Sequence, residues 1–145
     1  MNIKAFIDTN VLLDWLLKER PEKLLAEKLF SVARAGLFDA FISTQSIIDA
    51  SYSAQKCGLD FASFKPALQS LRSFITVLAI DDIDLSWAVE HYTGDFEDDA
   101  QYASAYNNAC DYFITRDNAL FSLNTPFCPM KVISPEAFVS AMSPE

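Results

Sequence analysis

The stretch AFIDTNVLLDWL, residues 5–16, decides the fold. Its first three residues are apolar and predict a buried strand, and the apolar run from Val11 to Leu17 predicts a helix that returns to the core. Asp8 lies between the two, followed by Thr9 and Asn10. An acid at this point can cap the helix or take part in a site, and the rest of the sequence has to decide between these roles.

Short apolar segments elsewhere in the chain also predict strands. Together with the first they cover residues 3–7, 40–43, 76–80, 112–115 and 131–133. Most are continuous apolar runs, which is typical of strands covered on both faces. Helical patterns fill the gaps, so the sequence predicts an α/β fold. We expect a parallel sheet of four to five strands with helices on both faces, in one domain over residues 1–145.

Individual residues indicate where helices begin and end. Pro21 suits the first turn of a helix, and Ser134 followed by Pro135 predicts the capped start of the last one. The three glycines each follow a helical stretch, where a residue that tolerates a positive φ angle can end a helix. Pro66 interrupts an otherwise helical pattern, so we expect a break or a new start there.

The composition suits a globular chain with a sizeable core. Hydrophobic residues make up 51% of the 145 residues, and no apolar run approaches the roughly 20 residues of a membrane span. The chain begins with a strand pattern rather than a basic leader, and its three cysteines lack metal-type spacing. We therefore expect a cytoplasmic protein with no membrane association.

Charge is unevenly distributed along the chain. The net charge of −9 argues against broad attraction to nucleic acid. Residues 1–75 carry nine Lys and Arg against eight Asp and Glu, whereas residues 76–145 carry two against twelve. A solvated acidic face explains most of these acids. Any polyanionic ligand should therefore approach from the N-terminal half.

Several acids lie next to the ends of predicted strands. Asp8 ends the first strand, and Asp117 follows the strand YFIT (112–115) in the sequence TRD. Asp49 lies in the helix after the second strand, and residues 97–99 open the helix that leads into YFIT. Singly, each could be a cap, a turn or a solvated helix residue. Because ligands of parallel α/β sheets bind beyond the carboxyl ends of the strands, we expect these acids at one edge.

Packing alone does not require such a cluster of like charges. Two carboxylates about 4 Å apart repel by roughly 4 kcal/mol at an effective dielectric constant near 20, so some would take up protons. A hard divalent cation relieves the repulsion, and oxygen ligands alone select Mg²⁺ or Mn²⁺. The cluster therefore predicts that Asp8 binds a metal ion, in a site suited to attack of water on a phosphodiester.

Other chemistries find little support in the sequence. The single histidine, His91, lies in an acidic helix, so zinc sites and Ser–His–Asp arrangements are poorly supplied. A Gly-rich phosphate loop and a dinucleotide fingerprint are both absent from the sequence.

The same residues resemble the PIN-domain family of nucleases. FIDTNVLLDWL, residues 6–16, is similar to the family's opening motif, in which the Asp binds metal and the Asn supports it. DFEDDAQYASAYNNACDYFITRD, residues 95–117, is similar to the closing half, where an ED pair opens a helix and TRD or TRN ends the next strand. The spacing matches without gaps, and the similarity spans nearly the whole chain.

The resemblance implies a Mg²⁺- or Mn²⁺-dependent endoribonuclease of the VapC-like toxin type. Its catalytic and metal-binding residues would be Asp8, Asp49, Asp98 and Asp117, supported by Thr9, Asn10, Thr115 and Arg116. Arg116 could meet a phosphate or pair with nearby acids. Small single-domain members are often the toxin half of a bacterial toxin–antitoxin pair. The resemblance therefore also implies an RNA substrate and an antitoxin partner, and it allows a homodimer.

Two positions depart from the family pattern. Asp49 stands where the family commonly has Glu, and it is one methylene shorter, so it would reach a metal through water. Asp99 stands where a small apolar residue is usual, so it would crowd the pocket or face solvent.

Helical geometry decides which of residues 97–99 can point inward, because successive residues differ by about 100° in direction. Gln101, Ser104 and Asn108 mark a polar face of this helix, and Glu97 falls on it. Periodicity slightly favours Asp99 as the inward residue. Alignment with the closing motif of the PIN-domain family, counted back from TRD, instead selects Asp98. We adopt that assignment.

Two other functions fit parts of the pattern. The Asp49 substitution and the negative charge also suit a PIN-fold binding module without activity. A phospho-acceptor signalling domain likewise gathers acids beyond a parallel sheet, but it normally begins with an acidic pair and uses a late lysine. Here Ile7 precedes Asp8, and Lys131 is the only late lysine.

Overall fold

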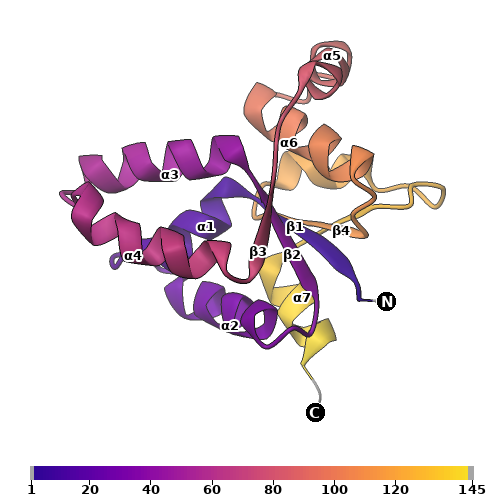
Figure 1. Ribbon diagram of the computed structural model, residues 1–145. Coiled ribbons are helices and arrows are strands. Elements are labelled where there is room, and N and C mark those ends of the chain that lie inside the picture. The colour runs from indigo at the N-terminus through magenta and orange to yellow at the C-terminus, as the bar shows by residue number, and fades with distance from the viewer. Residues whose placement is uncertain (1, 144–145) are drawn as a thin grey trace.

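The computed structural model describes residues 2–143 and is built around one parallel sheet (Figure 1). The five strands are arranged in the order β3-β2-β1-β4-β5, and every pairing is parallel. They are β1 (Lys4–Ile7), β2 (Asp39–Ser43), β3 (Ile75–Leu78), β4 (Tyr112–Ile114) and β5 (Lys131–Ile133). The predicted parallel α/β sheet is confirmed, and the strand boundaries differ from the predicted ones by at most two residues.

Helices cover both faces of the sheet, as the sequence predicts. They are α1 (Thr9–Leu16), α2 (Lys23–Arg34), α3 (Thr44–Lys56), α4 (Phe61–Arg72), α5 (Asp82–Glu90), α6 (Phe96–Asn107) and α7 (Pro135–Met142), with a 3₁₀ helix η1 (Asn118–Leu123). The first four and α7 lie on one face, while α6 and η1 lie on the other (Figure 1). Helix α5 packs on α6 and projects from the body.

The alternation of side chains along β1 divides the core into two layers. Ala5 and Ile7 point to the layer beneath α1, α2 and α7. Phe6 points to the opposite layer, where its ring stacks on Phe113 of β4 with centroids 5.2 Å apart. Both faces of the strand are therefore buried, which explains why its sequence is continuously apolar.

The strand order creates a switch point between β1 and β4. From β1 the chain proceeds outward through β2 and β3, and it then returns to the other side of β1 to form β4. The backbone nitrogen of Asp8 donates to the carbonyl of Ile114 at 3.0 Å, just beyond the paired strands. In open α/β sheets the crevice at such a point is where ligands bind.

Two local predictions are corrected by the structure. Helix α4 runs through Pro66 without a break. The residue four positions earlier, Ala62, is exposed, so water can reach the carbonyl that loses its helical partner. Helix α2 begins at Lys23, two residues beyond Pro21. The capped start at Ser134 is confirmed, since its hydroxyl accepts from the backbone nitrogen of Ala137.

Within residues 2–143, none of the helices has the length and apolar character that crossing a membrane requires.

Candidate active site

Asp8 is fully buried at the point where β1 ends and α1 begins. Its carboxylate accepts hydrogen bonds from the backbone nitrogen of Thr9 at 2.7 Å and from Thr115 Oγ1 at 2.8 Å. Burial raises the pKa of Asp8 to about 6, because the charges of Asp117 and Asp95 add to burial and outweigh the two hydrogen bonds. Asp8 is therefore a helix cap and also a dehydrated carboxylate held in one orientation.

Asp98 and Asp117 form a carboxyl pair beside Asp8. Burial and the hydrogen bond to Asp117 raise the pKa of Asp98 well above its ordinary value, and the same bond lowers the pKa of Asp117. The opposite directions of the two pKa shifts indicate that Asp98 is the partner that more readily keeps a proton and Asp117 the one that more readily stays charged. The Asp117 carboxylate also accepts from the backbone nitrogen of Ala119 at 3.0 Å, while its own nitrogen donates to Thr115 Oγ1 at 2.9 Å.

Asp99 points away from this pair. It is fully buried, and its carboxylate accepts from the backbone nitrogen of Thr93 at 2.8 Å and from the Thr93 hydroxyl. The expectation that Asp99 crowds the pocket or faces solvent is wrong, because it fastens the loop before α6 instead. Of the two candidates, the structure brings Asp98 next to Asp8 and Asp117.

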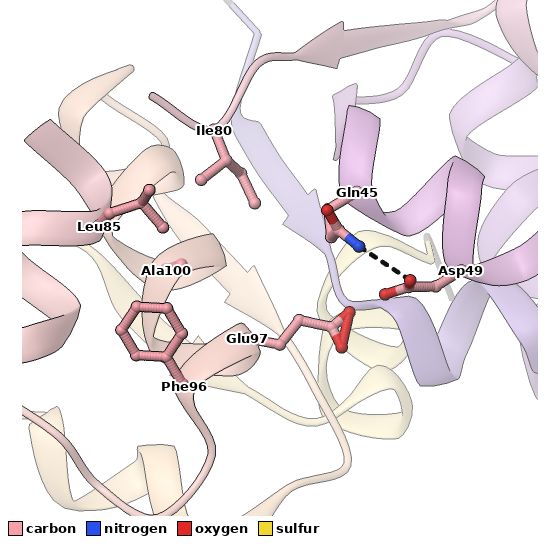
Figure 2. A pocket seen from close by; sticks show the side chains of 7 residues that line it. All are labelled: Gln45, Asp49, Ile80, Leu85, Phe96, Glu97 and Ala100. Carbon is pink, nitrogen blue, oxygen red and sulfur yellow. Dashed lines mark hydrogen bonds between the residues drawn. The ribbon is translucent and has the colours of Figure 1, made fainter. Parts of the chain in front are cut away.

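Asp49 lies apart from these three carboxylates. It is half-buried on α3, and its Oδ1 accepts from Gln45 Nε2 at 2.9 Å (Figure 2). Its carboxyl partner is Glu97 of α6, whose pKa is raised well above the ordinary value by burial and by the hydrogen bond to Asp49. The structure thus pairs Asp49 with Glu97. The Asp49 carboxylate contacts Gln45 and Glu97 rather than the three other acids.

An open hollow of about 350 Å³ is lined by Asp8 and Asp98 at one end and by Asp49 and Glu97 at the other. We call it the acidic hollow; it is lined by Asp8, Thr9, Asn10, Leu13, Asp49, Tyr52, Ser53, Asp95, Glu97 and Asp98. Asp95 is a lining residue that the strand-end pattern does not indicate; its side chain caps α6 by accepting from the backbone nitrogen of Asp98 at 3.1 Å. Its sequence signal is that of a helix N-cap, because an Asp immediately before a helix can accept from the backbone nitrogen three residues later.

A buried polar network lies beneath the acidic hollow. Thr9 Oγ1 and Ser46 Oγ are 2.7 Å apart, and Gln101 bonds to both, through Nε2 to Thr9 at 3.1 Å and through Oε1 from Ser46 at 2.8 Å. Ser43 Oγ joins by donating to Ser46 Oγ at 3.1 Å. Gln101 and Ser104 are fully buried, so these two residues of the predicted polar face lie in the interior, whereas Asn108 is exposed. The network fixes the starts of α1 and α3 against α6.

The remaining supporting residues occupy different surroundings. Arg116 donates to both carboxylate oxygens of Asp14, at 2.8 and 3.1 Å, so of its two predicted roles the structure shows the pairing with an acid. Asn10 is exposed at the rim of the acidic hollow. Lys131 Nζ donates to the carbonyl of Thr125 at 2.6 Å. A phospho-acceptor site would need this lysine beside Asp8 instead.

The donor chemistry of the site fits a hard divalent cation. No group of three or more acidic, histidine or cysteine side chains within residues 2–143 is arranged closely enough to hold an ion as it stands. Of the four predicted ligands, Asp98 and Asp117 therefore form one hydrogen-bonded pair beside Asp8, while Asp49 pairs with Glu97, which was not among the four. All the donors are oxygen atoms, and Glu97 Oε1 is buried with no hydrogen-bond partner in the described part of the chain. Oxygen donors of this kind fit a hard divalent cation.

Comparison with known proteins identifies related sequences and folds. The family model described as PIN domain matches residues 4–119. A toxin–antitoxin complex from Klebsiella pneumoniae is similar at a TM-score of 0.64 and 18% identity, covering 90% of this chain and 97% of that one. No curated protein matches the sequence.

Two further solved structures share the fold. VapC20 of Mycobacterium tuberculosis, described as a toxin that cleaves the sarcin–ricin loop, has a TM-score of 0.68 and 13% identity, covering 83% of this chain and 95% of its own. VapBC2 of Rickettsia felis, bound to a fragment of its promoter DNA, has a TM-score of 0.64 and 13% identity, covering 91% and 98%.

Proposed function

The chain belongs to the PIN-domain family, and from this premise we propose that it is a Mg²⁺- or Mn²⁺-dependent endoribonuclease that hydrolyses RNA phosphodiester bonds. One observation carries the proposal. Asp8, Asp98 and Asp117 come from three separate parts of the chain and lie beside one another at the switch point of the sheet, where Asp98 is hydrogen-bonded to Asp117. Their mutual repulsion disfavours the fully charged cluster unless it takes up protons or binds a cation.

Asp8, Asp98 and Asp117 would hold the ion, with Asp49 and Glu97 flanking it and acting through water. When bound, the cation supplies an activated water and neutralises charge on the phosphate. Thr115 and the backbone of Thr9 hold the Asp8 carboxylate in place. Asn10 lies at the exposed rim, where the substrate enters. Arg116 fixes the loop that carries Asp117.

We further propose that the protein is the toxin half of a toxin–antitoxin pair and acts on RNA in the cytoplasm. Structural likeness to the toxin–antitoxin complexes of K. pneumoniae and R. felis supports an antitoxin partner, and likeness to the M. tuberculosis toxin supports an RNA target. Ile83 and Val89 on α5 are 70% and 66% exposed. Such apolar surface supports an interface with an antitoxin or with a second copy of the chain.

Cleavage of a panel of structured RNAs in the presence of Mn²⁺ tests the proposed activity. The wild-type protein should cut at least one RNA, and Asp8→Asn should abolish the cut because it removes a metal ligand and leaves the helix cap in place. Asp82→Asn, at an exposed acid at the start of α5, is the charge-matched control and should remain active. Full activity of Asp8→Asn would overturn the metal-site assignment.

Thermal melting tests metal binding without relying on activity. An ion that binds only the folded chain stabilises it, by about 2.7 kcal/mol at one hundred times its dissociation constant. Millimolar Mn²⁺ should therefore raise the Tm of the wild type and of Asp82→Asn, and raise that of Asp8→Asn much less. An unchanged wild-type Tm would contradict the proposed cation site.

A further inference from the structure

A second hollow of about 440 Å³ lies at the ends of α1 and α3. It is lined by Leu16, Leu17, Lys18, Glu19, Arg20, Cys57, Gly58 and Leu59, and we call it the end hollow. On α1 the lining passes from Leu13 of the acidic hollow to Leu17 of the end hollow. On α3 it passes from Ser53 to Cys57. Each step is four residues, and residues four apart share a helix face, so the two hollows follow one another along one surface.

This surface leads away from the proposed cleavage site. Helices α1 and α3 follow neighbouring strands and pack against each other (Figure 1). Their first turns, capped by Asp8 and Ser43, lie at the acidic hollow, and their last residues lie at the end hollow. Between Asp49 and Lys56 the axis of α3 rises by about 10 Å, at about 1.5 Å per residue. That length corresponds to about three stacked nucleotides at a rise of about 3.4 Å each.

The charge changes sign along the surface. Five acids and no base line the acidic hollow. Lys18 and Arg20 line the end hollow together with a single acid, and Lys56 lies beside it in the last turn of α3. Among the described residues, neither Lys18 nor Lys56 takes part in a salt bridge. A phosphate beyond the one at the cation is therefore repelled by the acidic hollow and attracted by these lysines.

Tyr52 of α3 lies between the acids and the lysines. It lines the acidic hollow one helical turn before Lys56, and 62% of the residue is exposed. Lys56 Nζ lies 5.1 Å from the centroid of the Tyr52 ring. Proteins that bind single-stranded nucleic acid combine these two features, because a base stacks on an aromatic ring while basic residues follow the backbone.

We propose that Tyr52, Lys56 and Lys18 form a path that holds the RNA strand on one side of the cleaved bond. A base next to that bond stacks on Tyr52, and the phosphates that follow bind Lys56 and Lys18. This inference rests on the proposed ribonuclease function and names the surface that holds the substrate. RNA fits the path better than an acidic protein segment does, because the path continues directly from the proposed site of phosphodiester cleavage.

The salt dependence of RNA binding tests the two lysines. Fluorescence anisotropy of a short labelled oligoadenylate gives the Kd without cleavage when each variant also carries Asp8→Asn. Each phosphate contact to a single strand contributes about 0.7 to the slope of log Kd against log salt, so Lys18→Gln with Lys56→Gln should lower the slope by about 1.4. Lys28→Gln is the control, since Lys28 is exposed on α2 and lines neither hollow. An unchanged slope in the double variant would overturn the path and leave Lys56 to complement the dipole of α3.

Variants of Tyr52 test the stacked base in the same binding assay. Tyr52→Ala should raise the Kd by about five- to a hundredfold, the range for loss of one base–aromatic stack. Tyr52→Phe keeps the ring and should bind as tightly as the parent. Phe127→Ala should also bind normally, because Phe127 is 93% exposed and lines neither hollow. Equal losses in Tyr52→Ala and Tyr52→Phe would overturn the stack.

Cleavage with Asp8 intact separates this inference from the proposed function. If the wild type cuts RNA and the Tyr52 and lysine variants bind and cut equally well, the path is overturned and the ribonuclease proposal stands. Binding that depends on Tyr52 and the lysines, without any cleavage by the wild type, would overturn the ribonuclease proposal and support the path. Absence of both cleavage and such binding would overturn the two together.

Discussion

The guanidinium of Arg116 donates two hydrogen bonds to the buried carboxylate of Asp14, from Nε at 2.8 Å and from Nη2 at 3.1 Å. Asp14 lies on α1, the helix that begins after Asp8, and Arg116 stands between Thr115 and Asp117. The pair therefore ties the loop after β4 to the helix after β1. A two-bond contact fixes orientation as well as distance, so Arg116 is a positioning residue for Asp117.

Arg116→Lys should weaken this link, because a lysine cannot make two parallel bonds to one carboxylate. We expect the free energy of unfolding to fall by about 1–3 kcal/mol, and kcat for RNA cleavage to fall with little change in KM. Urea unfolding and steady-state cleavage measure these effects. Arg20→Lys is the control, since the Arg20 guanidinium lies 4.0 Å from Asp14. Equal losses at the two positions would argue against a positioning role.

Asp98→Asn and Asp99→Asn should have opposite effects on activity and stability. Asp98→Asn should lose most cleavage, since it removes a carboxylate that lies beside Asp8 and Asp117 and that we propose as a metal ligand. Asp99→Asn should keep most cleavage but lower the free energy of unfolding by about 1–3 kcal/mol, because the amide nitrogen that replaces one carboxylate oxygen cannot accept the hydrogen bond which that oxygen accepts from Thr93. Parallel melting and cleavage assays measure both quantities. The reverse pattern would show that Asp99 is the site residue.

Without divalent metal, the protein should lose stability as the pH rises. The pKa of Asp8 is about 6 in the folded chain against an ordinary 3.8, because burial disfavours its charged form. Its contribution to stability is therefore complete below pH 3.8 and is lost as the pH rises through about 6. The raised pKa values of Asp98 and Glu97 extend the decline to higher pH.

Melting temperatures between pH 5 and pH 8, in the presence of a chelator, measure this decline. Asp8→Asn should flatten the part between pH 5 and pH 7, since asparagine does not titrate. A wild-type Tm that rises over this interval would contradict the burial of an ionisable Asp8.

Gln101→Leu should destabilise the protein, because it leaves the hydroxyls of Thr9, Ser43 and Ser46 without their shared amide partner. The expected cost is about 1–3 kcal/mol in the free energy of unfolding, the range for an unsatisfied buried polar group. Gln69→Leu on α4 makes the same change at an exposed position and is the matched control. Urea unfolding of both variants decides whether the buried network stabilises the fold.

The pattern of apolar runs was sufficient to predict the sheet. Continuous burial of Ala5, Phe6 and Ile7 requires cover on both faces, and a parallel sheet between helices is the arrangement that provides it. The prediction failed at Pro66, because the cost of a proline in a helix depends on whether water can reach the freed carbonyl. Solvent access of that kind is a property of the surrounding structure and is not visible in local sequence.

For the site, the sequence by itself determined which residue types could meet. Asp8 and Asp117 follow strands, and the carboxyl ends of parallel strands share one edge, so their approach follows from strand order and chain direction. The tertiary structure alone decided the partners: Asp98 with Asp117, Asp49 with Glu97, Asp99 with Thr93, and Gln101 with the hydroxyls beneath the site. Helical periodicity gives the direction in which a side chain leaves the helix axis. The residue that this side chain contacts depends on which other elements pack against that face of the helix.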